Sequence, residues 1–149
     1  MSKNEMIRVI VLLLFCIYIS REDIKTHCIR NKHLLVALVA GVPLVAVSME
    51  FYVYTSCLIG AIGGFVISFL ISWFSKGEIG MGDVKLIAVA GLYLGSQLLG
   101  TAVFWALTLI ILFGIIQWFR KKVTRKTEYP FAPFFSGGVL ITFCLQLIA

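Results

Sequence analysis

The sequence predicts an all-α, polytopic membrane protein with six transmembrane helices in a single bundle. Of its 149 residues, 60% are hydrophobic and 13% are charged, and the mean hydropathy is +1.02, whereas soluble domains are about 45–50% apolar. Lipid cannot satisfy backbone amides, so each apolar run that crosses must be helical. The chain has three prolines and no Ser, Gln or Gly tract. We therefore treat residues 1–149 as one six-span domain.

Six apolar runs approach the length of about 20 helical residues that a bilayer core of about 30 Å requires. They cover residues 5–24, 34–49, 51–75, 83–99, 101–119 and 131–149. A basic residue precedes the first run, as in a signal peptide, but no small-x-small cleavage site follows, so we expect a retained helix. The second run is short and contains Pro43. A five-span arrangement with this segment at the interface is therefore an alternative.

The basic residues orient the predicted bundle. All of the 13 Lys and Arg residues except Lys3 and Arg8 lie in or next to alternate connections, after the first, third and fifth runs, with Lys85 just beyond the second of these connections. The positive-inside rule places that side in the cytoplasm, so we expect both termini outside. The bases lie in short loops next to membrane spans, which indicates contact with anionic lipid headgroups and no nucleic-acid partner.

Two aspartates at one membrane boundary stand out. Asp23 ends the first run in "SREDIKTHCIRN", and Asp83 begins the fourth in "GMGDVKL". An acid at this depth costs a few kcal/mol unless it faces water or a partner, which favours a functional role. Two structural alternatives stay open: Asp83 can be a helix N-cap, and Asp23 can pair with Lys25 or His27 at the surface.

Glycines before Asp83 favour the functional interpretation. Gly77, Gly80 and Gly82 allow unusual backbone conformations and close approach by another chain, such as an extended peptide. Two carboxyl groups near one water cannot both ionise easily, so one keeps a proton. The ionised member can activate water while the protonated member polarises a peptide carbonyl. The sequence does not assign the two roles.

Three blocks of sequence resemble one family, the type IV prepilin peptidases, which are membrane aspartyl proteases of the G-x-G-D class. "GMGDVKL" is similar to the family's G-x-G-D-x-K-L, "DIKTHCIRNKHL" to its first-aspartate block, and "YPFAPFFSGG" to its late P-F-x-P-x-x-x-x-G segment. The resemblance implies that Asp23 and Asp83 are the catalytic pair and that the chemistry needs no metal or cofactor. It also implies cleavage of the short basic leader of prepilins or pseudopilins at the cytoplasmic face of the bacterial inner membrane.

The chain departs from the family pattern at two points. Arg30 stands where the family usually has proline after isoleucine, which predicts a less rigid turn after the first span. Many relatives also carry an N-terminal region with paired C-x-x-C motifs that is associated with N-methylation. This chain starts at the first span, and its four cysteines form no C-x-x-C pair. We therefore expect no methyltransferase activity from it.

The expected substrate contacts surround the two aspartates. They are Gly80, Gly82, Lys85, Glu22, Glu78, Pro130 and Pro133. The glutamates are acidic groups that can meet a basic leader. The prolines can shape a substrate groove or merely cap the last span, and the resemblance favours the groove.

Several alternatives remain. Asp23, Asp83 and His27 can form a metal site, although three scattered ligands are a weak signal. Buried acids also mark small ion-coupled transporters, and a non-catalytic subunit of a pilus or secretion assembly is a third possibility. The "GAIGG" segment at residues 60–64 allows close helix packing within the bundle or in a homodimer. His33 is expected to be an interfacial residue.

Overall fold

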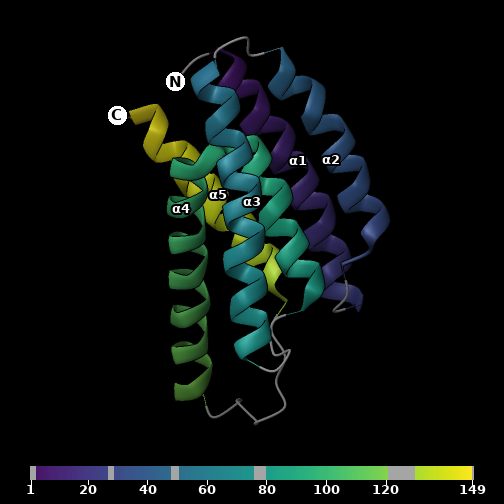
Figure 1. Ribbon diagram of the computed structural model, residues 1–149. Coiled ribbons are helices and arrows are strands. Elements are labelled where there is room, and N and C mark those ends of the chain that lie inside the picture. The colour runs from purple at the N-terminus through teal and green to yellow at the C-terminus, as the bar shows by residue number, and fades with distance from the viewer. Residues whose placement is uncertain (1–2, 27–28, 48–50, 76–79, 121–129, 149) are drawn as a thin grey trace.

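The computed structural model describes residues 3–26, 29–47, 51–75, 80–120 and 130–148. Over these residues the chain forms five helices and no strand, in agreement with the predicted all-α class (Figure 1). The helices are α1 (Lys3–Thr26), α2 (Asn31–Ala46), α3 (Phe51–Phe74), α4 (Met81–Phe119) and α5 (Phe131–Ile148).

The prediction of six transmembrane helices is not supported by the structure. Within its described residues, three helices are long and apolar enough to cross a membrane: α3, α4 and α5. The α2 helix has only 16 residues. The α1 helix has 24, but charged residues lie near both of its ends, from Lys3 and Arg8 to Asp23 and Lys25. The fourth and fifth predicted spans belong to one 39-residue element, α4.

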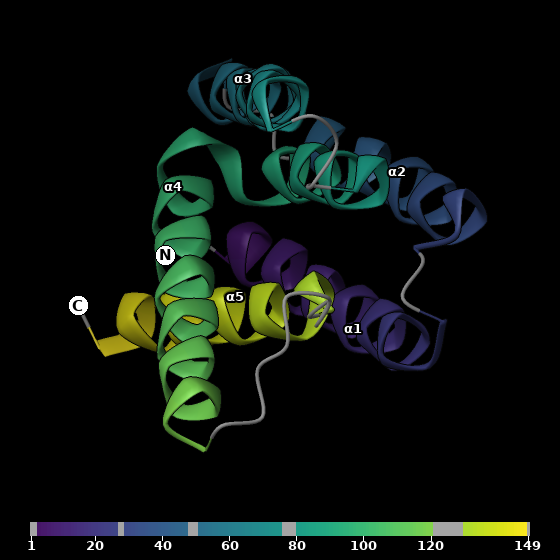
Figure 2. The same cartoon turned by 90° about the horizontal axis from the view of Figure 1, so that it is seen from below.

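A break inside α4 separates the two parts that the sequence suggested as separate spans. Gly95 has φ 75° and ψ 174°, a conformation that only glycine adopts readily. The freed N–H of Ser96 donates to Ser56 Oγ of α3 at 3.3 Å, which compensates for the interrupted helix ladder. Figure 2 shows the two parts of α4 running in different directions on either side of this break. The chain therefore turns at Gly95, several residues before the loop expected near residue 100.

Small residues let the helices pack closely around α4. Gly60 of α3 lies against Gly91, where a Cβ on Gly60 would meet the Gly91 carbonyl oxygen at 2.7 Å. Gly138 of α5 packs in the same way on the backbone of Ala102 and Ala106. The prediction that "GAIGG" packs within the bundle is confirmed at Gly60, while the homodimer stays a prediction. This close packing fixes α4 as the centre of the fold.

The Gly60 contact predicts unequal effects of two neighbouring substitutions. Gly60→Ala forces its methyl group against the fixed backbone of α4 and is expected to lower the free energy of unfolding by about 1–3 kcal/mol. Gly63→Ala is the matched control, because a Cβ at Gly63 meets no atom within 4 Å. Alanine there is expected to be neutral or slightly stabilising. Thermal unfolding in detergent measures both, and equal melting temperatures would contradict the packing described here.

The α2 helix is held to α4 by an aromatic residue in the core. Tyr93 is 1% exposed, and its hydroxyl donates to the backbone carbonyl of Ala37 at 2.5 Å. Gly41 gives the Tyr93 ring room, because a Cβ there would meet it at 2.7 Å. This contact sets the distance between α2 and α4, which line a groove described below.

Both ends of the chain lie at one end of the bundle. In Figure 1 α1 begins and α5 ends near the top of the view, where α3 also begins. The C-terminal end of α1 and the N-terminal ends of α4 and α5 therefore point the other way. This arrangement brings Asp23 and Asp83 to the same end of the molecule.

Candidate active site

Asp23 lies in the last turn of α1 and is 4% exposed. Its Oδ2 accepts a hydrogen bond from the backbone N–H of Ala132 at 3.0 Å. Ala132 is the second residue of α5, where an N–H has no partner within its own helix. Asp23 thus caps α5 from another helix, and the positive end of the α5 dipole favours a carboxylate at this position.

Pro130 and Pro133 frame the amide that binds Asp23. Pro130 immediately precedes α5 and Pro133 is its third residue. Proline suits this first turn because the N–H it lacks would have no helical partner. The prolines therefore start α5 beside Asp23. Whether they also contact a substrate, as the sequence suggested, stays a prediction.

Asp83 is the third residue of α4 and is partly buried. Gly80 is the N-cap, with φ −63° and ψ 141°, so the interpretation of Asp83 as the N-cap itself is wrong. The Asp83 N–H donates to the Gly80 carbonyl at 3.0 Å, and the Asp83 carboxyl accepts a hydrogen bond from the Gly80 N–H. The bond from the Gly80 N–H to the Asp83 carboxyl is the side-chain half of a capping box, in which the N3 carboxyl reaches back to the N-cap amide.

The carboxyl groups of Asp23 and Asp83 interact electrostatically across the helix interface. Asp83 lies in the first turn of α4, and Asp23 lies against the first turn of α5. Two positive helix ends therefore flank a pair of acids that would otherwise repel each other. Such a pair can hold one proton between two sites, which suits general acid–base chemistry.

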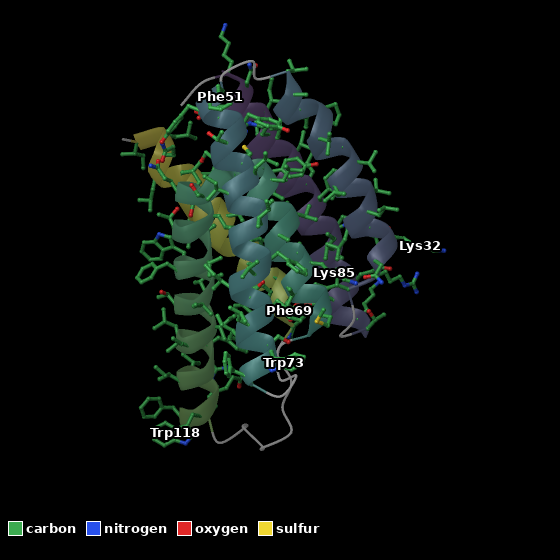
Figure 3. All side chains as sticks on the ribbon, viewed as in Figure 1. Lys32, Phe51, Phe69, Trp73, Lys85 and Trp118 are labelled. Carbon is green, nitrogen blue, oxygen red and sulfur yellow. The ribbon has the colours of Figure 1, made fainter. Side chains whose placement is uncertain are left out.

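The candidate site is set back from the ends of the longest helices. Lys85, two residues after Asp83, lies well short of Trp73 and Trp118 in Figure 3, where these tryptophans mark the far ends of α3 and α4. Tryptophan favours the interface between lipid and water. The first turns of α4, marked by Lys85, therefore lie deeper along the bundle than its aromatic ends.

The two described glycines before Asp83 have different surroundings. A Cβ on Gly82 would lie 3.0 Å from the Cβ of Ile29, so Gly82 allows the segment before α2 to approach α4. Gly80 is exposed, and the nearest atom to a Cβ there is Asp83 Oδ2 at 3.5 Å. Gly80 leaves room for another chain, and Gly82 packs against Ile29. Their roles as substrate contacts stay predictions. Gly77 lies outside the described residues.

A groove of about 280 Å³, which we call the Lys85 groove, runs between α2, α3 and α4. Its lining residues are mostly apolar, and they are Asn31, Leu34, Leu35, Leu38, Phe65, Lys85, Ala88 and Val89. Lys85 Nζ donates to Asn31 Oδ1 at 3.0 Å near the start of both helices. Lys85 therefore belongs to this groove, and its described partner is a neutral amide rather than a carboxylate.

Glu22 faces α2, although it neighbours Asp23 in the sequence. One of its oxygens lies 2.9 Å from His33 Nε2 and the other lies 3.5 Å from the Arg30 guanidinium. His33, expected only at an interface, also packs edge-on against Tyr18 with ring centroids 4.9 Å apart. Glu22 thus has basic partners within the chain. Glu78, its expected counterpart, lies outside the described residues.

Arg30 keeps the backbone conformation that a proline would impose. It is the N-cap of α2 with φ −73°, within the range of about −65 ± 15° fixed by the proline ring. The replacement therefore leaves this turn in a proline-compatible form and adds a cation beside Glu22. Backbone angles do not report how rigid the turn is, so the predicted loss of rigidity at Arg30 stays a prediction.

The described residues contain no group of three His, Cys, Asp or Glu side chains that could hold a metal ion. His27, which the alternative metal site requires, lies outside that part of the chain. The metal alternative therefore gains no support from the described contacts, and the absence of a metal stays an expectation.

Sequence reasoning missed three partners of the candidate site. The Ala132 amide binds Asp23, Asn31 binds Lys85, and Ile29 packs on Gly82. The spacing of Pro130 and Pro133 was a signal for a helix start, and therefore for free amides, near residue 132. Asn31 and Ile29 carried no comparable signal, because their roles depend on where α2 packs.

Comparisons with known proteins agree with the motifs. The model of the type IV leader peptidase family matches residues 10–115. Proteins named prepilin leader peptidase/N-methyltransferase from Bacillus subtilis (strain 168) and Pectobacterium carotovorum subsp. carotovorum are 28% and 31% identical over 93% and 87% of this chain. The aligned regions cover 56% and 48% of those proteins, so the chain spans about half the length of these relatives.

A similarly named protein from Burkholderia pseudomallei (strain 1026b) is 32% identical over 56% of this chain and 28% of its own length. No solved structure matches the chain. Because the relatives' printed names include a methyltransferase, the expected lack of that activity stays a prediction. The family match covers well over half of the sequence and includes both aspartates, and the chain belongs to the type IV leader peptidase family.

Proposed function

We propose that this chain is a membrane aspartyl endopeptidase that removes the short basic leader from type IV prepilins or pseudopilins. One observation carries the proposal: Asp23 and Asp83, from the ends of separate helices, interact at one end of the bundle. The membership in the leader peptidase family and the names of the relatives support this substrate class.

In the proposed mechanism the two carboxyl groups share one proton. The ionised member removes a proton from water as the water oxygen attacks the scissile carbonyl, while the protonated member donates a hydrogen bond to that carbonyl. Collapse of the tetrahedral intermediate breaks the C–N bond, and a proton from the pair reaches the departing amine. The Ala132 and Gly80 amides hold the two side chains in place during these steps. No cofactor is needed.

We propose that the Lys85 groove receives the apolar helix that follows the scissile bond. Its apolar walls come from α2 and α3, and Ala88 and Val89 of α4 form part of the lining. The groove starts at Lys85, so a helix lying in it would begin close to the first turn of α4, which carries Asp83 and follows the exposed Gly80. Gly80, Gly82, Lys85, Glu22, Glu78, Pro130 and Pro133 remain the proposed substrate-binding residues.

We propose that the acids face the cytoplasm and that both termini lie on the outer side of the bacterial inner membrane. The basic residues at the ends of α1 and α4, on the side of the acids, support this orientation. Because α4 turns at Gly95, its end returns toward the end of the bundle where α4 begins (Figure 1). Cysteine-accessibility labelling of residues at each end of the bundle tests the orientation.

The deciding experiment uses the purified chain reconstituted with a prepilin. Mass spectrometry of the product is expected to show a new N-terminus immediately before the apolar helix, formed by the wild type and absent without the protein. Failure of the folded protein to cut prepilins or pseudopilins from its own organism would overturn the proposal. Cleavage that continues in the separate Asp23→Asn and Asp83→Asn variants would overturn the aspartyl mechanism while keeping the substrate class.

Filling the Lys85 groove is expected to weaken substrate binding. Ala88→Leu places a larger side chain in the groove, so KM for the prepilin should rise by about tenfold with kcat less affected. Gly114→Leu is the control, because a Cβ at Gly114 meets no atom within 4 Å. Steady-state cleavage assays measure both constants. An unchanged KM for Ala88→Leu would place the substrate helix elsewhere.

A further inference from the structure

A second groove lies between α1 and α2 and takes no part in the proposed catalysis. Its volume is about 420 Å³, and it is lined by Val11, Leu14, Phe15, Tyr18, His33 and Val36. These residues are apolar except for the Tyr18 hydroxyl and the His33 ring. The groove shares no lining residue with the Lys85 groove, which uses Leu34, Leu35 and Leu38 of α2. Two different faces of α2 therefore border two separate grooves.

The end of this groove near the acids carries an excess of positive charge. The lining residues of α1 follow helical spacing, and this face continues from Tyr18 to Arg21 and Lys25, three and seven residues later. Arg21 and Lys25 are exposed. Across the groove the Arg30 side chain is 66% exposed and lies 3.5 Å from Glu22. This end of the groove thus carries three basic side chains and one carboxylate.

The groove does not lead to the catalytic acids. Asp23 is five residues after Tyr18, so it projects from nearly the opposite side of α1, where it meets Ala132 of α5. A peptide in the α1/α2 groove would have α1 between itself and the Asp23 carboxyl. This geometry argues against the substrate helix as the occupant.

We propose that the α1/α2 groove binds one anionic phospholipid. An acyl chain fits the apolar lining, which runs along α1 for two helical turns. The phosphate would lie at the cationic end, within reach of Arg21 and Arg30. The Tyr18 and His33 rings, 4.9 Å apart, stand between these two regions, at the depth that amphipathic rings prefer. Basic residues at a membrane surface attract anionic headgroups more strongly than zwitterionic ones.

The test measures lipid retention by the intact chain. Native mass spectrometry of the purified protein would compare phosphatidylglycerol with phosphatidylcholine of the same acyl chains. The wild type is expected to retain one phosphatidylglycerol in preference to phosphatidylcholine. Arg21→Gln and Arg30→Gln should each weaken phosphatidylglycerol retention by about fivefold. Val36→Trp, which fills the groove, should lower retention of both lipids.

Lys32→Gln is the matched control, because it removes one positive charge from a side chain that points away from the bundle (Figure 3). It should leave retention unchanged. Equal retention of the two lipids by the wild type, or equal losses in Lys32→Gln and Arg30→Gln, would show a non-specific lipid layer and overturn the proposal. Normal retention with impaired prepilin cleavage in Val36→Trp would assign the groove to the substrate instead. The lipid measurement needs no substrate, so it does not depend on the proposed peptidase activity.

Discussion

Asp83→Asn is expected to lower prepilin cleavage by about a thousandfold, the scale on which loss of a general acid or base acts. The substitution keeps an oxygen that can accept the Gly80 N–H, so the start of α4 should be preserved. It removes the shared proton site that the interaction with Asp23 provides. Conversion of prepilin in membranes with equal amounts of each variant measures the effect.

Glu5→Gln is the matched control for this result. It makes the same carboxylate-to-amide change in the first turn of α1, at the opposite end of the bundle from the acids. Cleavage should stay near the wild-type level in this variant. Wild-type cleavage by Asp83→Asn would contradict the assignment, and a lowered melting temperature of that variant would show that the loss has a structural cause.

The helical class and the two acids could be predicted because both depend on local sequence. Apolar runs must become helices in lipid, and Asp23 and Asp83 stand at the boundaries of two such runs. The break in α4 could not be placed in the same way. The segment contains Gly91, Gly95 and Gly100, and only contact with Ser56 from a distant helix distinguishes Gly95.

The partners of the site residues were also beyond sequence reasoning. Glu22 and Asp23 are neighbours, yet one pairs with Arg30 of the α2 N-terminus and the other with the amide of Ala132. Helical geometry sends consecutive side chains to different faces. Which helix each face meets depends on packing, and a backbone amide such as that of Ala132 has no side-chain signature. Gly82 is a similar case, because its contact with Ile29 depends on where the segment before α2 packs.

Two substitutions at Asp23 are expected to separate its chemical role from its structural one. Asp23→Asn keeps an acceptor for the Ala132 N–H, so stability should change little while cleavage falls about as far as in Asp83→Asn. Asp23→Leu leaves that buried amide without a partner. Asp23→Leu should therefore lower the free energy of unfolding by about 1–3 kcal/mol, in addition to the loss of cleavage. Thermal unfolding and cleavage assays on the same preparations measure both effects.

The double variant Asp23→Asn/Asp83→Asn gives the sharpest test of the pair. Residues that act as one catalytic unit have strongly non-additive effects, because removing either member already removes the function of both. Residual cleavage in the double variant should therefore equal that of either single variant. If the two losses multiply instead, each aspartate acts independently, and the electrostatic interaction between their carboxyl groups is not the basis of catalysis.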